Sequence, residues 1–238
     1  MKHTIKFGIV ALALTAMAPV FAVDGDTRSE EGAVGWTPLA IGIATPVQLP
    51  WGLNRWDVYG LDANIVYSDA PTMYGLDLGC CFTLVREDMR GGQFSILCNY
   101  NYGDVYGARG TIGPNIGYGN VYGFEGGLGS IQFGNFYGLQ MTFLGGFQKQ
   151  LWGVALAGLA NVSEESSHGA TVALGCNIAR EAHGLQASLV FNTTDELCGA
   201  QIGLFNFAEN CDGGFQIGLI NIIRSNVVKV LPLVNCYF

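Results

Sequence analysis

A glycine-centred unit recurs along most of this chain and restricts the fold to architectures that are built from repeats. The phrase Gly-x-Gln-Ile-Gly-Leu-x-Asn at residues 199–206 returns at residues 214–221, and looser copies precede it at spacings of 15 to 17 residues. Even with 35 glycines among 238 residues, chance placement would not hold such a spacing, so we expect a tandem repeat. The units begin at Gly60, Gly75, Gly92, Gly107, Gly123, Gly138, Gly153, Gly169, Gly184, Gly199 and Gly214.

Polarity alternates within each unit with a period of two, which is the pattern of a β-strand with two different faces. The first, third and fifth residues after the glycine are usually apolar, as at Leu76, Leu78 and Leu204. The second and fourth are polar or small, as at Asp77 and Gly79, and charged residues collect between the units, where they mark turns. We therefore expect an all-β chain of about twelve strands, with one strand in each 15-residue unit.

Two folds accommodate such a chain, and we favour an antiparallel meander barrel of the transmembrane type. Transmembrane strands need about 9 to 11 residues of alternating polarity, with aromatic girdles at both ends. In the barrel the apolar columns face lipid, the Gln and Gly columns face the lumen, and the large side chains before the glycines form the girdles on alternate sides. The candidate aromatic belt comprises Tyr59, Tyr74, Tyr106, Tyr122, Tyr137 and Trp152.

The alternative fold is a β-solenoid, in which each unit is one rung and identical positions stack directly. The repeat length of one strand favours it, and so does Pro232, because proline lacks the N–H that a closing barrel strand needs. The apolar columns would then form the core. A sixth apolar position, seen at Leu144, Val190 and Ile220, would face water, which a soluble solenoid should not allow.

The first 22 residues have the features of a secretory signal peptide. Lys2 and Lys6 precede an apolar run at residues 7–18 that is too short to span a bilayer, and residues 20–22 form a cleavage site. Residues 23–57 then form an N-terminal segment with an edge strand, and residues 58–238 a single β-repeat domain. Cleavage leaves 9 basic against 19 acidic residues, a net charge of about −10, which excludes nucleic-acid binding.

Composition and cysteine usage fit an exported, folded protein. Half of the residues are hydrophobic and 13% are charged, which excludes intrinsic disorder. Seven cysteines are an odd number, so at least one is unpaired within the chain. We expect most of them to fill the interior as small apolar side chains. The most plausible disulfide joins Cys198 to Cys211, which lie in predicted turns of neighbouring repeats.

The repeats resemble those of bacterial surface-repeat proteins of the kind first described from Leptospira. The resemblance rests on the Gly-x-Gln-Ile-Gly-Leu-x-Asn units, on Val-Tyr-Gly-Leu-Asp at residues 58–62 and on Leu-Pro-Leu-Val-Asn at residues 231–235. It covers residues 58–238, and it is strongest from Gly184 onward and weakest between Gly107 and Gly145. It implies an exported bacterial cell-envelope protein without an assigned activity, and it identifies no catalytic residue.

Eight side chains in the polar column are candidate lumen-lining or ligand-facing residues. In a barrel they would line a narrow lumen, where acidic residues around Arg109 would give weak cation selectivity. In a solenoid they would face solvent. A plugged, structural interior is favoured over an open channel, because a small residue follows many of them two positions later. The candidates are Asp62, Asp77, Arg109, Glu125, Gln140, Gln186, Gln201 and Gln216.

His168 and His183 share one repeat position and are the best candidates for a metal ligand or a pH switch. Other units carry Tyr, Trp or Cys there, so a ladder position that tolerates histidine is the favoured interpretation. The sequence contains no nucleophile elbow, P-loop or zinc-protease motif, and we assign no catalytic residue, metal site or cofactor.

These patterns favour a structural or surface-display protein over an enzyme. We expect it in the outer membrane or at the cell surface of a bacterium, with outer-membrane lipid as its partner and without nucleic acid. One alternative is a small passive pore for ions or small solutes. The other is a soluble solenoid adhesin that binds glycan or protein through its tyrosine column.

Overall fold

The computed structural model describes residues 33–44 and 47–237, which are built almost entirely from β-strands. The single helical turn among them is the 3-10 helix η1 (Leu53–Arg55), and all of them belong to one unit, Ala33–Phe238. The expected signal peptide lies outside the described residues. The strands are β1 (Gly35–Ala44), β2 (Val47–Leu49), β3 (Trp56–Ala70), β4 (Met73–Gly79), β5 (Phe82–Val85), β6 (Met89–Ser95), β7 (Cys98–Asn101), β8 (Val105–Thr111), β9 (Pro114–Gly117), β10 (Val121–Gln132), β11 (Phe136–Ala157), β12 (Ala160–Ala173), β13 (Cys176–Ser188), β14 (Phe191–Ile202), β15 (Phe205–Cys211), β16 (Phe215–Ile223) and β17 (Val230–Cys236).

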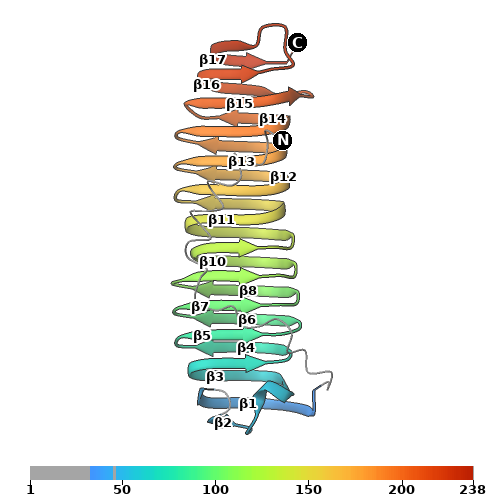
Figure 1. The fold of residues 1–238 in the computed structure, drawn as a ribbon, viewed down its shortest axis with the longest axis vertical. Coiled ribbons are helices and arrows are strands. Elements are labelled where there is room, and N and C mark those ends of the chain that lie inside the picture. The colour runs from blue at the N-terminus through green and yellow to red at the C-terminus, as the bar shows by residue number, and fades with distance from the viewer. Residues whose placement is uncertain (1–32, 45–46, 238) are drawn as a thin grey trace, which may run out of the picture. The chain divides into compact units, whose positions relative to one another are not determined.

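The strands stack as the rungs of a β-solenoid of about 11 turns (Figure 1). From β3 to β16 the strands pair in parallel with strands one turn away, so that Tyr122 lies between Tyr106 of the preceding rung and Tyr137 of the following one. Among the described strand pairs, only β1–β2 and β16–β17 are antiparallel. The expected transmembrane meander barrel is not supported, because in a meander neighbouring strands run in opposite directions.

Each turn contains two strand segments rather than the single strand that the repeat suggested. A longer segment such as β8 is followed by a corner, a shorter segment such as β9, and a second corner that leads into the next rung. Where the chain bends gently, one strand continues through the corners, as β11 does. The described residues therefore contain seventeen strands, where about twelve were expected. The N-terminal segment is part of the stack, since β1 pairs in parallel with β3.

The repeat glycine occupies a backbone conformation that side chains rarely adopt. At Gly123 φ is +139°, and a Cβ added there would lie 2.0 Å from the carbonyl oxygen of Gly107 in the preceding rung. Between Gly75 and Gly107 the stacked glycine is Gly91, not the expected Gly92. The spacings from Gly75 to Gly91 and from Gly91 to Gly107 are therefore both 16 residues.

The interior is largely polar, which reverses the core expected for a solenoid. Leu139 and Met141 are 36% and 45% exposed, whereas Gln140 between them is fully buried. The apolar columns therefore face outward, and the polar columns face inward. Buried apolar side chains fill one inner column, which comprises Val58, Met73, Met89, Val105, Val121, Phe136 and Leu151.

An asparagine ladder runs through the other side of this interior. From Asn161 to Asn221 each side-chain amide donates to Oδ1 of the asparagine in the next rung, at 3.0 Å from Asn161 to Asn177 and at 2.8 Å from Asn206 to Asn221. Asn99 donates likewise to Asn115, and Ser130 and Gly146 occupy the two rungs between Asn115 and Asn161. Identical rungs place identical amides one strand spacing apart, and each amide can both donate and accept. The asparagine column comprises Asn99, Asn115, Asn161, Asn177, Asn192, Asn206 and Asn221.

Antiparallel strands close both ends of the stack. β17 pairs antiparallel with β16 and contains Pro232, and β2 pairs antiparallel with β1. Proline is tolerated in an edge strand, where its missing N–H leaves no ladder bond unmade, and it discourages pairing with another chain. Pro232, which is awkward in a closing barrel strand, suits this position.

Candidate functional site

All eight candidate lumen-lining or ligand-facing side chains lie in one buried column of the interior. They occupy successive rungs, with Gln93, Ala155 and Thr171 between them. Near the C-terminal end, Gln201 Nε2 donates to Gln186 Oε1 and Gln216 Nε2 donates to Gln201 Oε1, each at 2.7 Å. Asp62, Asp77, Arg109, Glu125, Gln140, Gln186, Gln201 and Gln216 are each at most 1% exposed.

Arg109 and Glu125 form a fully buried ion pair between adjacent rungs. Arg109 Nη2 and Nε lie 2.6 and 2.9 Å from Glu125 Oε2, and Nη1 donates to Asn101 Oδ1 at 3.1 Å. Desolvation makes either charge alone costly at this site, so each group depends on the other. Loss of either partner would therefore leave a buried unpaired charge, and the pair offers no charge to a solute.

Two carboxyl groups stack in the same column nearer the N-terminal end. Asn64 and Ser68 donate hydrogen bonds to Asp62, and Gln93 Nε2 donates to Asp77 Oδ2 at 3.2 Å. Burial raises the pKa of Asp62 to about 6, against the hydrogen bond from Ser68. Burial, and then the neighbouring Asp62, raise the pKa of Asp77 well above its ordinary value. The interior thus favours the neutral acid at both positions.

The residues of the expected aromatic belt form one exposed column, all on the same side of the solenoid. Tyr106 and Tyr122 stack at 4.9 Å between ring centroids, with 4° between their planes. The Arg90 guanidinium continues the stack, 5.3 Å from the centroid of Tyr74 and 5.1 Å from that of Tyr106. In the barrel these rings would lie alternately at the two membrane interfaces, and the structure does not show that arrangement. The ring column comprises Tyr59, Tyr74, Arg90, Tyr106, Tyr122, Tyr137, Trp152, His168 and His183.

His168 and His183 extend this ring column. His168 stacks on Trp152 at 3.9 Å and on His183 at 4.6 Å, and His183 Nε2 lies 3.7 Å from a carboxylate oxygen of Glu181. Partial burial, and then the His183 ring, lower the pKa of His168 below its ordinary value. Within the described ranges, no group of three or more His, Cys, Asp or Glu side chains is arranged to hold a metal ion.

The seven cysteines are all free, so the expected Cys198–Cys211 disulfide is absent. Cys211 lies opposite Leu197 and is buried, whereas Cys198, the next residue along that rung, is exposed. Successive strand residues point to opposite faces, which places the two thiols on different sides of the sheet.

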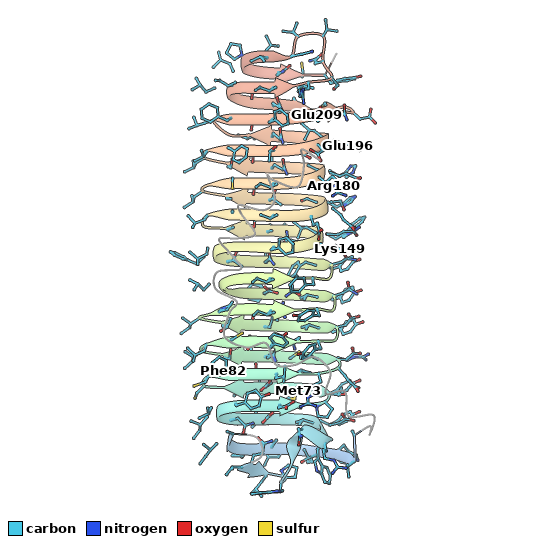
Figure 2. All side chains as sticks on the ribbon, viewed as in Figure 1. Met73, Phe82, Lys149, Arg180, Glu196 and Glu209 are labelled. Atoms are coloured by element: carbon cyan, nitrogen blue, oxygen red, sulfur yellow. The ribbon has the colours of Figure 1, made fainter. Side chains whose placement is uncertain are left out.

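Charged and exposed apolar side chains gather at opposite corners of the rungs. Figure 2 shows Lys149, Arg180, Glu196 and Glu209 along one long side of the stack and Phe82 along the other. The charged corner comprises Arg86, Glu87, Asp88, Asp104, Lys149, Glu164, Glu165, Arg180, Glu181, Asp195, Glu196, Glu209, Asp212 and Arg224. The apolar corner comprises Ile65, Ile96, Leu97, Ile112, Phe143, Leu159, Leu174, Leu189, Val190, Leu204 and Leu219, which are 46% to 73% exposed.

Polarity changes in a fixed order from one corner to the other. In the rung that begins β11, Tyr137 of the ring column is followed outward by Leu139, Met141 and then Phe143 of the apolar corner, which is 72% exposed. A second group of rings occupies the matching place beside the charged corner on the shorter segments. In it, Tyr102 stacks on Tyr118 at 5.4 Å, and Tyr118 on Phe133 at 4.8 Å.

The backbone of the apolar corner is hydrogen-bonded between rungs. Leu159 N donates to Leu144 O at 2.9 Å, and Ile220 N donates to Leu204 O at 3.0 Å. Gly175 N likewise donates to Leu159 O at 3.0 Å. A backbone whose polar groups are bonded within the protein is the condition for contact with hydrocarbon. The corner thus presents apolar side chains over a satisfied backbone.

Sequence reasoning missed Arg90 and Trp36 as members of this surface. Arg90 directly precedes Gly91, in the place that tyrosine occupies in neighbouring units, and choosing Gly92 as the repeat glycine concealed it. Trp36 lies in β1, before the first recognisable repeat, and contacts Tyr59 edge to face. The repeat spacing does not predict the position of Trp36, because the pairing register between β1 and β3 shifts between Thr37 and Leu39.

No protein-family model matches the chain, and no similar curated protein or solved structure is found. None of the helical residues that the structure describes forms a helix long and apolar enough to cross a membrane.

Proposed function

We propose that this protein is an exported bacterial envelope protein with a structural or surface-display role, and that its solenoid lies along an outer-membrane lipid leaflet. The observation that carries the proposal is the ordered change from charged to aromatic to apolar side chains across the rungs, in which Arg90 and Cys198 take the aromatic place in two rungs. Tyrosine and tryptophan gather at membrane interfaces, where one end of the ring is wet and the other apolar. The apolar corner would lie in hydrocarbon and the charged corner in water.

The width of the apolar zone supports one leaflet rather than a full span. Tyr137 and Phe143 are six residues apart along one rung, which corresponds to about 20 Å at roughly 3.3 Å per residue. Half of a hydrocarbon core is about 15 Å thick. The solenoid would therefore rest in the membrane surface without crossing it, in the manner of interfacial proteins. Its polar interior would stay bonded to itself.

Vesicle flotation tests this proposal. Wild-type protein is expected to float with phosphatidylcholine vesicles. A variant with Leu174→Lys and Leu189→Lys, at two residues that are 61% and 63% exposed, is expected to lose at least about tenfold in partition coefficient, because each ammonium must leave water.

The matched control carries Asn210→Lys and Glu196→Gln, which change the net charge by the same amount at the charged corner. It is expected to float like the wild type, and circular dichroism checks that all three proteins are folded. Wild-type protein that stays in the dense fraction, or a control that behaves like the double lysine variant, would contradict the lipid proposal.

A soluble adhesin is the second candidate, and the exposed ring column favours it. Stacking covers the faces of the inner rings, so that a glycan would meet ring edges and tyrosine hydroxyls. Glycan binding by lipid-free protein that the double lysine variant retains would favour this function. The pore alternative depended on a lumen lined by residues that are buried in contact with one another, and we do not retain it.

A further inference from the structure

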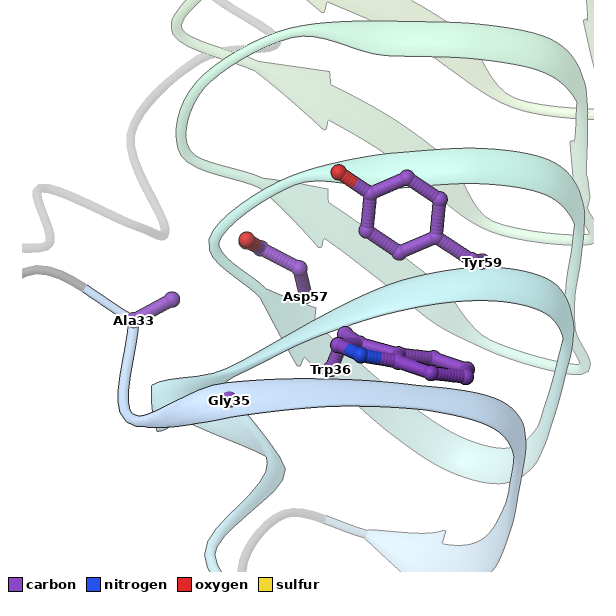
Figure 3. A pocket seen from close by; sticks show the side chains of 5 residues that line it. All are labelled: Ala33, Gly35, Trp36, Asp57 and Tyr59. Carbon is purple, nitrogen blue, oxygen red and sulfur yellow. The ribbon is translucent and has the colours of Figure 1, made fainter.

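An open pocket lies at the N-terminal end of the ring column. It is lined by Ala33, Gly35, Trp36, Asp57 and Tyr59 (Figure 3). The ring planes of Trp36 and Tyr59 are 81° apart, with their centroids 6.2 Å apart, so the two rings form adjoining walls. Farther along, Tyr122 is stacked on both sides, whereas Tyr59 has a parallel ring on one side only, that of Tyr74 at 4.7 Å.

A carboxylate completes this pocket. Asp57 forms no ion pair with any other described residue, and in Figure 3 its side chain lies between Ala33 and the two rings. Trp36 is 64% exposed and Tyr59 is 48% exposed, which leaves the rings accessible. The pocket therefore offers two aromatic walls and one uncompensated negative charge.

Two rungs away, the same kinds of group, two aromatic rings and an aspartate, surround a cation in a different arrangement. There the Arg90 guanidinium lies over the rings of Tyr74 and Tyr106, and its Nη2 is 3.6 Å from a carboxylate oxygen of Asp88. Asp88 and Asp57 occupy the same column, since Met89 pairs with Met73 and Met73 with Val58. The pocket thus offers the kinds of group that hold the Arg90 guanidinium, with perpendicular rings and no cation of the chain between them.

We propose that the pocket binds a weakly hydrated organic cation of the size of a quaternary ammonium group. The rings of Trp36 and Tyr59 supply cation–π attraction, and Asp57 neutralises the charge. A small inorganic cation is a poorer ligand, because two ring walls cannot replace the water that it would lose. The site is separate from the apolar corner and does not depend on lipid association.

Calorimetric titration of lipid-free protein tests the site. Choline is expected to bind, whereas its neutral carbon isostere 3,3-dimethylbutanol is expected to bind at least about tenfold more weakly, since only the charge differs. Asp57→Asn is expected to weaken choline binding about tenfold, and Trp36→Leu by about fivefold or more. Glu196→Gln, which removes an exposed carboxylate from the same column at the far end, serves as the matched control and should bind like the wild type.

Equal affinity for choline and the isostere, or unchanged binding by Asp57→Asn, would overturn the proposal. Because Asp57→Asn is conservative and lies at the surface, a loss of binding with an unchanged thermal midpoint cannot be attributed to unfolding. Flotation with phosphatidylcholine and phosphatidylglycerol vesicles then separates the two sources of the cation. Weaker flotation of Asp57→Asn with the choline lipid alone identifies a lipid headgroup, and equal flotation with both identifies a soluble ligand.

Discussion

The inner column changes character between the first and the last rungs, although both are built on the same backbone. From β3 to β10 it contains ionisable side chains, whereas from β13 to β16 it contains glutamine only. The first region combines an ion pair, Arg109 with Glu125, and two stacked carboxyl groups, Asp62 and Asp77. The last region pairs like groups, as in Gln201 with Gln186.

This difference shows which side chains can occupy the same buried position in successive rungs. An amide donates and accepts, so a rung can be duplicated and still satisfy its neighbour, whereas stacked carboxylates repel and require a proton or a cation. The inner column advances by 15 residues between Gln186, Gln201 and Gln216. It advances by 16 at each step from Asp77 to Glu125. The stretch in which identical amides follow one another is also the stretch in which the repeat phrase is most regular.

Of the changes considered, replacing Arg109 in the region from β3 to β10 should lower the free energy of unfolding most. Arg109→Met leaves Glu125 buried without its partner, and we expect a loss of about 3 to 5 kcal/mol in the free energy of unfolding. The double variant Arg109→Met, Glu125→Gln should recover most of it, because the buried charge is gone. Urea denaturation measures both. A loss below about 1 kcal/mol in the single variant would show that the two regions do not differ as described.

The charged region should also respond to pH where the glutamine region does not. Asp62 has a pKa of about 6 in the folded protein against an ordinary value of 3.8, so its neutral form stabilises the fold below pH 3.8. That stability declines as the pH rises from 3.8 to about 6, by about 3 kcal/mol for this group. Asp77, whose pKa is also raised, extends the decline to higher pH.

Urea midpoints of the wild type and Asp77→Asn between pH 4.5 and 8 isolate this effect, since exposed carboxylates cancel in the comparison. Asp77→Asn should be more stable than the wild type at pH 8 and less dependent on pH. A parallel pH profile for the two proteins would mean that Asp77 is ionised in the folded state at no cost.

The sequence predicted the all-β class and the tandem repeat, but it did not decide which face of each strand is buried. Alternation at Leu139, Gln140 and Met141 is the same whichever side lies inside. The rule that apolar columns form a core failed because Gln and Asn side chains bond their own copies between rungs. The same amide recurs at a fixed repeat position, at Asn206 and Asn221, and this recurrence is the feature of the sequence that corresponds to the buried ladder.

The candidate site was predicted in part. The belt tyrosines were identified from their place before each glycine, and their shared position is enough to predict stacking once the strands are parallel. The apolar corner could not be recognised, because Leu174 and Leu189 were assigned to strand interiors and not to a bend. Arg109 and Glu125 share one repeat position, two residues after Gly107 and Gly123, but their pairing could be recognised only once adjacent rungs were known to stack in parallel.

Breaking the asparagine ladder should have a smaller effect than breaking the charged pair. Asn192→Ala removes the bond to Asn206 at 2.8 Å, the bond from Asn177 at 2.9 Å and the bond to the Ile202 carbonyl at 2.8 Å. Asn177 keeps a backbone partner, so we expect a loss of about 2 kcal/mol, with faster hydrogen exchange in β13 to β15. Asn210→Ala, at an exposed position, is the control, and an equal loss there would contradict a role for the ladder.

The smallest effect is expected from an ion pair that matches Arg109–Glu125 in chemistry and differs in burial. Arg224 Nη1 lies 2.9 Å from Glu209 Oε2, again one rung apart, but the two side chains are 61% and 37% exposed. Because water solvates either charge alone, Arg224→Met should cost less than about 1 kcal/mol in urea denaturation. If Arg224→Met lowers the free energy of unfolding as much as Arg109→Met does, burial is not what distinguishes the two ion pairs, and their stacking geometry is. If it costs little, burial decides which rungs can carry charge, and the neutral ladder is the arrangement that repeats without a compensating partner.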